Sequence, residues 1–171
     1  IFLADDDADL GGDGAESLFR DVALGPSRTD RLRVSGVEHS LFSHDPSQDT
    51  GGAFGVDAEG RTLTLGTNAW KAAAVNAEIG PDTVLRFAFR PGAEGELHGI
   101  GFANGDKALP EHVYVLDGTQ TNYGRLDHRY DGDGGFQNFA IPVGADFTGR
   151  FERMIFLADD DADLGGDGAE S

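Results

Sequence analysis

Short apolar runs separated by glycine-rich turns recur along most of the chain. The segment 83–90 alternates strictly, with Leu85, Phe87 and Phe89 separated by other side chains, and the segment 137–143 shows the same pattern. A period of two predicts β-strands with one buried face. We expect strands at 1–4, 18–24, 31–34, 61–65, 83–90, 96–102, 112–116, 137–143 and 151–158.

The segment 70–75 (WKAAAV) is the one run that resembles a helix, because its three alanines favour helical backbone. It spans only six residues and lies between strand-like runs, so we interpret it as extended. Many short strands joined by glycine turns are typical of all-β domains. We therefore predict a two-sheet β-sandwich of jelly-roll type.

Residues 1–17 (IFLADDDADLGGDGAES) recur without change as residues 155–171. The 171-residue chain thus fits one 154-residue period followed by 17 further residues, as expected of one unit from a tandem array. A choice of chain boundaries that overlaps the period is the alternative explanation. We divide the chain into 1–25, a strand–loop–strand hairpin that closes this or the preceding unit, 26–52, a polar junction or surface loop, and 53–171, the β-sandwich body.

The charge is strongly negative, at −18 for the whole chain. Counting the duplicated acids once leaves 25 acidic against 13 basic residues, or −12 per period. This balance argues against nucleic acid and anionic membrane surfaces as partners. There is no cysteine and no apolar run long enough to span a membrane. Clustered carboxylates instead indicate a hard divalent cation, Ca²⁺ above all, and we expect a secreted or cell-surface protein.

The duplicated segment contains an acidic loop that matches five ligand positions of an EF-hand. The matching residues are Asp5, Asp7, Asp9, Asp13 and Glu16 in the first copy, and Asp159, Asp161, Asp163, Asp167 and Glu170 in the second. Leu10 and Leu164 replace the glycine at position 6, and the flanks read as strands rather than helices. We therefore predict a calcium loop between β-strands. A solvated acidic loop that only favours solubility is the alternative.

Four stretches, 68–106, 117–124 (DGTQTNYG), 139–163 and 17–24 (SLFRDVAL), are similar to β-sandwich modules of marine bacterial polysaccharide-degrading enzymes and surface proteins. These modules resemble the calcium-dependent carbohydrate-binding families 36 and 60, which bind xylan. The resemblance implies that an acidic loop holds Ca²⁺ and that the cation contacts vicinal sugar hydroxyls. The implied calcium ligands are Asp159, Asp160, Asp161, Asp163, Asp167 and Glu170, or the equivalent Asp5, Asp6, Asp7, Asp9, Asp13 and Glu16.

Four further residues are candidates for ligand binding. Asn104 and Asp106 follow HGIGF and are expected near the same end of the sandwich as the acidic loop, with an ordinary turn as the alternative. Tyr123 and Tyr130 offer rings that stack on the apolar face of a sugar. Trp70 is either a third such ring or part of the core, and Tyr123 is expected to be the more exposed.

Two functions are compatible with these features. The first is a non-catalytic, calcium-dependent carbohydrate-binding module whose partner is a polysaccharide. The second is a calcium-stiffened repeat of a large extracellular adhesin or filament, whose partners are neighbouring units. Exchange of strands between chains is a further option, because the strand 1–4 occurs twice. Glu96 and His98 share a strand face, but a structural histidine is the commoner outcome and no catalytic motif is present.

Overall fold

The computed structural model describes residues 30–50, 52–66, 68–92 and 95–160. In this part the chain is all-β, as predicted, with antiparallel strands and two single-turn helices. The strands are β1 (Arg31–Val34), β2 (Val37–Ser43), β3 (Phe54–Val56), β4 (Leu63–Leu65), β5 (Ala69–Ile79), β6 (Leu85–Phe89), β7 (Leu97–Ala103), β8 (Val113–Asp117), β9 (Gln137–Ile141) and β10 (Gly149–Asp159). The helical turns are η3 (Pro110–His112) and α1 (Val143–Asp146).

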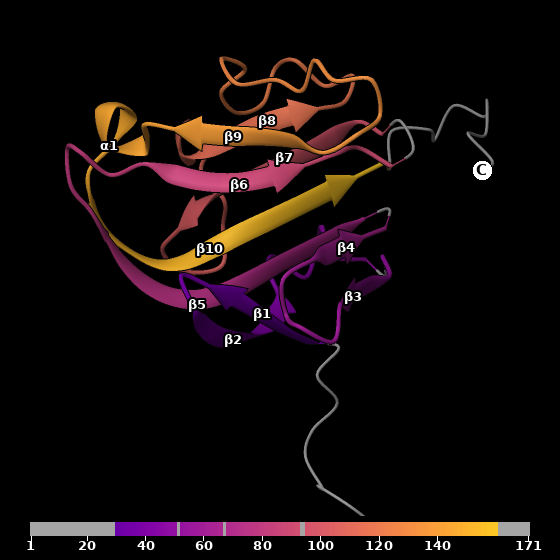
Figure 1. The fold of residues 1–171 in the computed structure, drawn as a ribbon, viewed down its shortest axis with the longest axis horizontal. Coiled ribbons are helices and arrows are strands. Elements are labelled where there is room, and N and C mark those ends of the chain that lie inside the picture. The colour runs from indigo at the N-terminus through magenta and orange to yellow at the C-terminus, as the bar shows by residue number, and fades with distance from the viewer. Residues whose placement is uncertain (1–29, 51, 67, 93–94, 161–171) are drawn as a thin grey trace, which may run out of the picture.

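The largest sheet has six strands in the order β1-β2-β5-β10-β7-β8 (Figure 1). The long strand β10 lies inside it, pairing antiparallel with β5 on one side and with β7 on the other. Its second half carries apolar side chains on both faces, and Ile155, Leu157 and Ala158 are almost completely buried. A continuous run of apolar residues is typical of a central strand that is buried on both faces.

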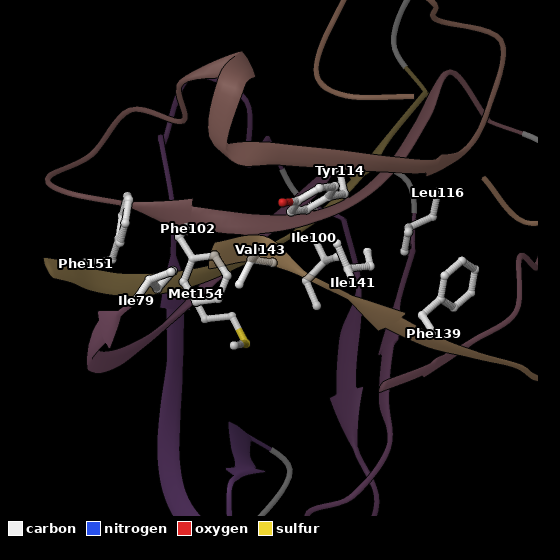
Figure 2. Close-up of a cluster of buried hydrophobic side chains, with 10 residues drawn as sticks. All are labelled: Ile79, Ile100, Phe102, Tyr114, Leu116, Phe139, Ile141, Val143, Phe151 and Met154. Atoms are coloured by element: carbon white, nitrogen blue, oxygen red, sulfur yellow. The ribbon is translucent and has the colours of Figure 1, made fainter. Parts of the chain in front are cut away.

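Two small sheets pack on one face of the large sheet, namely the pair β6–β9 and the pair β3–β4. Beneath β6–β9, Phe139 and Ile141 of β9 pack with Phe102, Tyr114 and their neighbours (Figure 2). Beneath β3–β4, a smaller cluster forms around Val56. The opposite face of the large sheet carries a third cluster, which is flanked by Ala108, Tyr123 and Leu126 from the long connections.

Most predicted strands in the described residues are confirmed within two residues at their ends. The segment 70–75 is extended, as predicted, and forms part of β5. Two strands were not predicted, β2 and β3. Because β2 pairs with β5, the surface-loop interpretation is wrong for residues 37–43. The predicted strand 137–143 ends earlier, because Val143 begins α1. The predicted strands 1–4 and 18–24 lie outside the described residues.

Candidate functional site

Strand β10 ends where the second acidic run begins. Its last residue, Asp159, pairs with Leu97 of β7, and the Asp159 carbonyl oxygen accepts a hydrogen bond of 2.9 Å from the Glu96 N–H. On the other side, the Asp160 N–H donates to Oδ1 of Asn68 at 2.9 Å. The backbone of the first two acidic residues is therefore held by the segments that precede β5 and β7.

The close approach of the segment before β7 explains a glycine at this point. A Cβ atom at Gly95 would lie 3.1 Å from the Asp159 carbonyl oxygen and 3.3 Å from Nε2 of His98. Contacts this short require the neighbouring atoms to move, so a larger residue would push the segment away from β10. The glycine thus contributes to the tight attachment of the acidic run to the sheet.

Of the predicted calcium ligands, only Asp159 and Asp160 belong to the described residues. Asp161, Asp163, Asp167, Glu170 and the six ligands of the first copy lie outside them. Among the described residues, that is 30–160 without 51, 67, 93 and 94, no group of three or more His, Asp or Glu side chains is arranged to hold a metal ion. The described structure therefore fixes where the acidic run begins and leaves calcium binding a prediction.

Tyr123 and Trp70 pack together on the sheet face opposite to β6–β9. Their ring centroids are 6.3 Å apart, and the Tyr123 hydroxyl points to the Ala108 carbonyl oxygen at 3.4 Å. Burial, followed by the negative charges of Asp45 and Asp159, raises the pKa of Tyr123 to about 12. Trp70 is a core residue, as the alternative interpretation proposed. Tyr123 is half-buried and more exposed than Trp70, as expected, and sugar stacking by its ring stays a prediction.

Asn104 and Asp106 lie away from the acidic run. Asn104 bridges to β10, where its Nδ2 donates to the Arg150 carbonyl oxygen at 3.0 Å and its Oδ1 accepts from the Glu152 N–H at 2.9 Å. Asp106 pairs with Arg153 at 2.7 Å. Because Ala103 is opposite Arg153 and Leu97 is opposite Asp159, the two positions on β10 are about 20 Å apart along the strand. The expectation that both groups share one end of the sandwich is wrong.

The Tyr130 hydroxyl forms hydrogen bonds with the backbone of the loop that follows it. The hydroxyl donates to the Gly135 carbonyl oxygen at 2.8 Å and accepts from the Gly134 N–H at 2.7 Å. Its ring packs edge-on against Phe89, with centroids 6.0 Å apart. The described contacts of Tyr130 thus connect the loop 131–135 to β6, whereas sugar binding by this ring stays a prediction.

Sequence reasoning missed a buried polar position at the end of β2. The His44 side chain has no exposed surface. The backbone N–H of His44 donates to the Trp70 carbonyl oxygen at 2.8 Å. Neither ring nitrogen of His44, nor Nε1 of Trp70, has a hydrogen-bond partner among the described residues. Burial, followed by the positive charge of Arg153, lowers the pKa of His44, while Asp45 and Asp106 act in the opposite direction. The sequence HDP (44–46) gave no indication that His44 is buried, because it is typical of an exposed turn.

A second charged group connects the turn after β2 to β5. Nζ of Lys71 lies 2.6 Å from Oδ2 of Asp49, and the Trp70 N–H donates to Oδ1 of the same carboxylate at 3.1 Å. Both charged side chains are largely buried, at 10% and 4% exposure. Burial favours the neutral acid, but the hydrogen bonds of Lys71 and its neighbours outweigh it and lower the pKa of Asp49. This contact has a structural role in fixing the turn.

A third polar group joins the connection 124–128 to α1. The Tyr114 hydroxyl donates to Oδ2 of Asp146 at 2.6 Å, and Arg125 pairs with the other oxygen of that carboxylate. Burial, helped by the hydrogen bond to Asp146, raises the pKa of Tyr114. A neutral tyrosine between a carboxylate and a guanidinium suits a structural bridge, because the hydroxyl stays a donor at all ordinary pH values.

Comparisons of the chain with protein-family models, with curated proteins and with solved structures found no match. In the part of the chain that the structure describes, no helix is long and apolar enough to cross a membrane. Function must therefore be argued from the residues and from the geometry of the described structure.

Proposed function

We propose that the chain is a calcium-dependent carbohydrate-binding module of a secreted or cell-surface protein, without catalytic activity. One observation supports this most directly: the acidic run begins at the anchored end of a buried central strand. A calcium loop benefits from such an attachment, because carboxylates that repel one another must be brought together around one ion. The six-stranded sheet with its covering strand pairs suits a jelly-roll sandwich, which we include in the proposal.

In this proposal the cation is held by the side chains of the acidic run. Asp159 and Asp160 would provide the first oxygens, and Asp161, Asp163, Asp167 and Glu170 the remaining ones. Calcium would supply a positive centre with coordination positions for vicinal hydroxyls of a polysaccharide. Because Asn104 and Asp106 lie about 20 Å along β10 from Asp159, they would not take part in recognition at the cation.

The test is retention of the protein on immobilised polysaccharides, with neutral and acidic xylans as the first probes. We expect retention in millimolar Ca²⁺ and its loss in EDTA, with recovery when Ca²⁺ is restored. The variant Asp45→Asn, Asp133→Asn, which neutralises acidic positions in turns outside the run, should keep the same calcium-dependent retention. Retention that is unchanged by EDTA, or absent on every glycan tested, contradicts the proposal.

The second candidate is a calcium-stiffened repeat of an extracellular adhesin or filament. A specific observation favours it, because the duplicated segment includes residues 155–159, which form the end of β10. In an array, each unit would thus end its central strand with the sequence that also stands at 1–5, and the acidic run would lead into the next unit. Native mass measurement of a two-unit chain with and without Ca²⁺, combined with small-angle scattering, distinguishes this function, since we expect Ca²⁺ to shorten and stiffen the joint.

A further inference from the structure

An open cavity of about 380 Å³ lies between the large sheet and the beginning of β6. Its walls are mainly apolar. They come from β1, β2 and the turn between them, from β5, β7 and β10, from residues 83–85 at the start of β6, and from the first residue of α1. The residues that matter for the argument are Val34, Val37, Val75, Leu85 and Met154. We call this cavity the β6 groove. An open groove with mainly apolar walls is a candidate place for an apolar segment to dock.

Among the described residues, the hydrophobic clusters on this face have an interval between them whose side chains are only partly buried. Two separate clusters lie on the same face of the large sheet, one under β6–β9 and one under β3–β4. Val34, Val75 and Phe156 flank both clusters, and all three are only partly buried. The three residues therefore lie between the two clusters, and two of them, Val34 and Val75, also line the groove. Figure 1 shows β6–β9 and β3–β4 as separate strand pairs.

Strand β6 is suited to pair with a docked apolar segment. In the described residues β6 pairs with β9 alone, which leaves its second edge without a strand. Its inward side chains Leu85, Phe87 and Phe89 are only partly buried. An edge strand with apolar side chains and unpaired backbone groups readily accepts a further strand.

The chain itself contains one suitable segment outside the described residues. Residues 1–4 repeat the sequence 155–158, which already has its place in β10, and residues 161–171 contain a single large apolar side chain, Leu164. The segment 18–24 (LFRDVAL) instead places Leu18, Val22 and Leu24 on one side of an extended chain. Arg20 shares that side, and Glu78 is the single acidic residue among those that line the groove.

The connection to the fold is long enough. Six residues, 25–30, separate this segment from β1, and they can span about 20 Å. Val34 at the end of β1 lines the groove itself. We propose that residues 18–24 of the same chain occupy the β6 groove as an additional strand paired with the free edge of β6. The inference does not depend on calcium or on carbohydrate binding.

Disulfide trapping tests the proposal directly, because the full-length chain has no cysteine of its own. The variant Val22→Cys, Val84→Cys joins the inward side of the segment to a residue that lines the groove. We expect mild oxidation to give a monomer two mass units lighter, and to do so about tenfold faster than in denaturant. The matched control is Ala23→Cys, Val84→Cys, whose first cysteine lies on the other side of an extended segment. Equal rates for both variants, or a bond between two chains, overturn the proposal.

Hydrogen exchange on the full-length chain gives an independent measurement. We expect the substitution Val22→Asp to speed the exchange of amides in residues 85–89 about tenfold, whereas Ala23→Asp leaves it unchanged. The fluorescence of Trp70, which is buried on the opposite face, shows whether the variants stay folded. The proposal is wrong if residues 18–24 exchange at the rate of an unfolded peptide in the unsubstituted protein.

Discussion

His44 is the one buried histidine, and its surroundings penalise a positive charge. The ring is completely buried, with Arg153 of β10 as a nearby like charge and with Asp45 and Asp106 as weaker opposing charges. Its pKa in the folded protein is therefore below the ordinary value of 6.5. The unfolded chain takes up a proton at a pH where the folded protein does not, so the free energy of unfolding must decrease as the pH falls below 6.5.

We predict that the free energy of unfolding decreases as the pH is lowered from 7.5 to 5.5, with a slope below the limit of about 1.4 kcal/mol per pH unit for a single group. Urea unfolding measures this. His44→Gln should remove this part of the pH dependence, because glutamine does not titrate. His128→Gln serves as the control, since it leaves His44 in place. If the unsubstituted protein is equally stable across this range, His44 is not buried as the structure places it.

Asp49 gives a second test at the scale of a single residue. We predict that Asp49→Ala lowers the free energy of unfolding by about 3 kcal/mol, because it leaves the buried ammonium of Lys71 without its partner. The exposed ion pair between Arg125 and Asp127 is the matched control, and Asp127→Ala should change stability by less than about 1 kcal/mol. Urea unfolding measures both. The double variant Asp49→Leu, Lys71→Met should be less destabilised than Asp49→Ala, since it removes the unpaired charge.

Individual elements differed in how far sequence could predict them, for physical reasons. β6 and β9 were predicted because one face is apolar and the other polar. β2 was missed because only Leu41 of its seven residues is buried, so the strand lacks a regular apolar period. It forms because its backbone pairs with β1 and β5. Pairing of this kind depends on distant parts of the chain and leaves no local pattern.

The sequence predicted which acidic residues form the candidate site, but it did not predict where they lie in the fold. The acidic residues stand out in the sequence, but the hydrogen bond from the Asp160 N–H to Asn68 joins residues 92 positions apart. Asn104 and Asp106 were placed wrongly because the antiparallel register puts the end of β7 opposite Arg153, whereas the start of β7 lies opposite Asp159. Their positions relative to the acidic run depend on the register between β7 and β10, which the sequence alone does not reveal.

Asn68 allows a prediction about the attachment of the acidic run. Its backbone has a φ of 53°, a left-handed conformation that glycine and asparagine tolerate. Asn68→Gly should keep this backbone while removing the hydrogen bond to Asp160. We expect calcium affinity to fall about tenfold, since supporting contacts of metal ligands commonly contribute this much. Isothermal titration with Ca²⁺ measures it. Asn104→Gly, at the distant end of β7, is the control, and an equal fall in both variants contradicts the prediction.

For the whole molecule, calcium should stabilise the folded state. An ion that binds the folded protein raises its free energy of unfolding by about 2.7 kcal/mol when its concentration is 100 times the dissociation constant. We therefore predict a clear rise of the melting temperature in Ca²⁺ that EDTA reverses, measured by calorimetry. Mg²⁺ should have a smaller effect, because it demands a more rigid octahedral geometry. A melting temperature unaffected by Ca²⁺ contradicts both proposed functions.

The antiparallel order of the large sheet has a mechanical consequence. β1, β2, β5 and β10 alternate in direction, so the chain enters β1 and leaves β10 toward the same end of the sheet. If units are joined in an array, a pulling force would act across the width of the sheet, between an edge strand and an inner one. Such a load separates β1 from β2 by breaking one hydrogen bond at a time. A shear load along the strands would instead act on all these hydrogen bonds at once. Resistance to tension would then have to come from the joint between units, which makes the acidic run the mechanical element of the array.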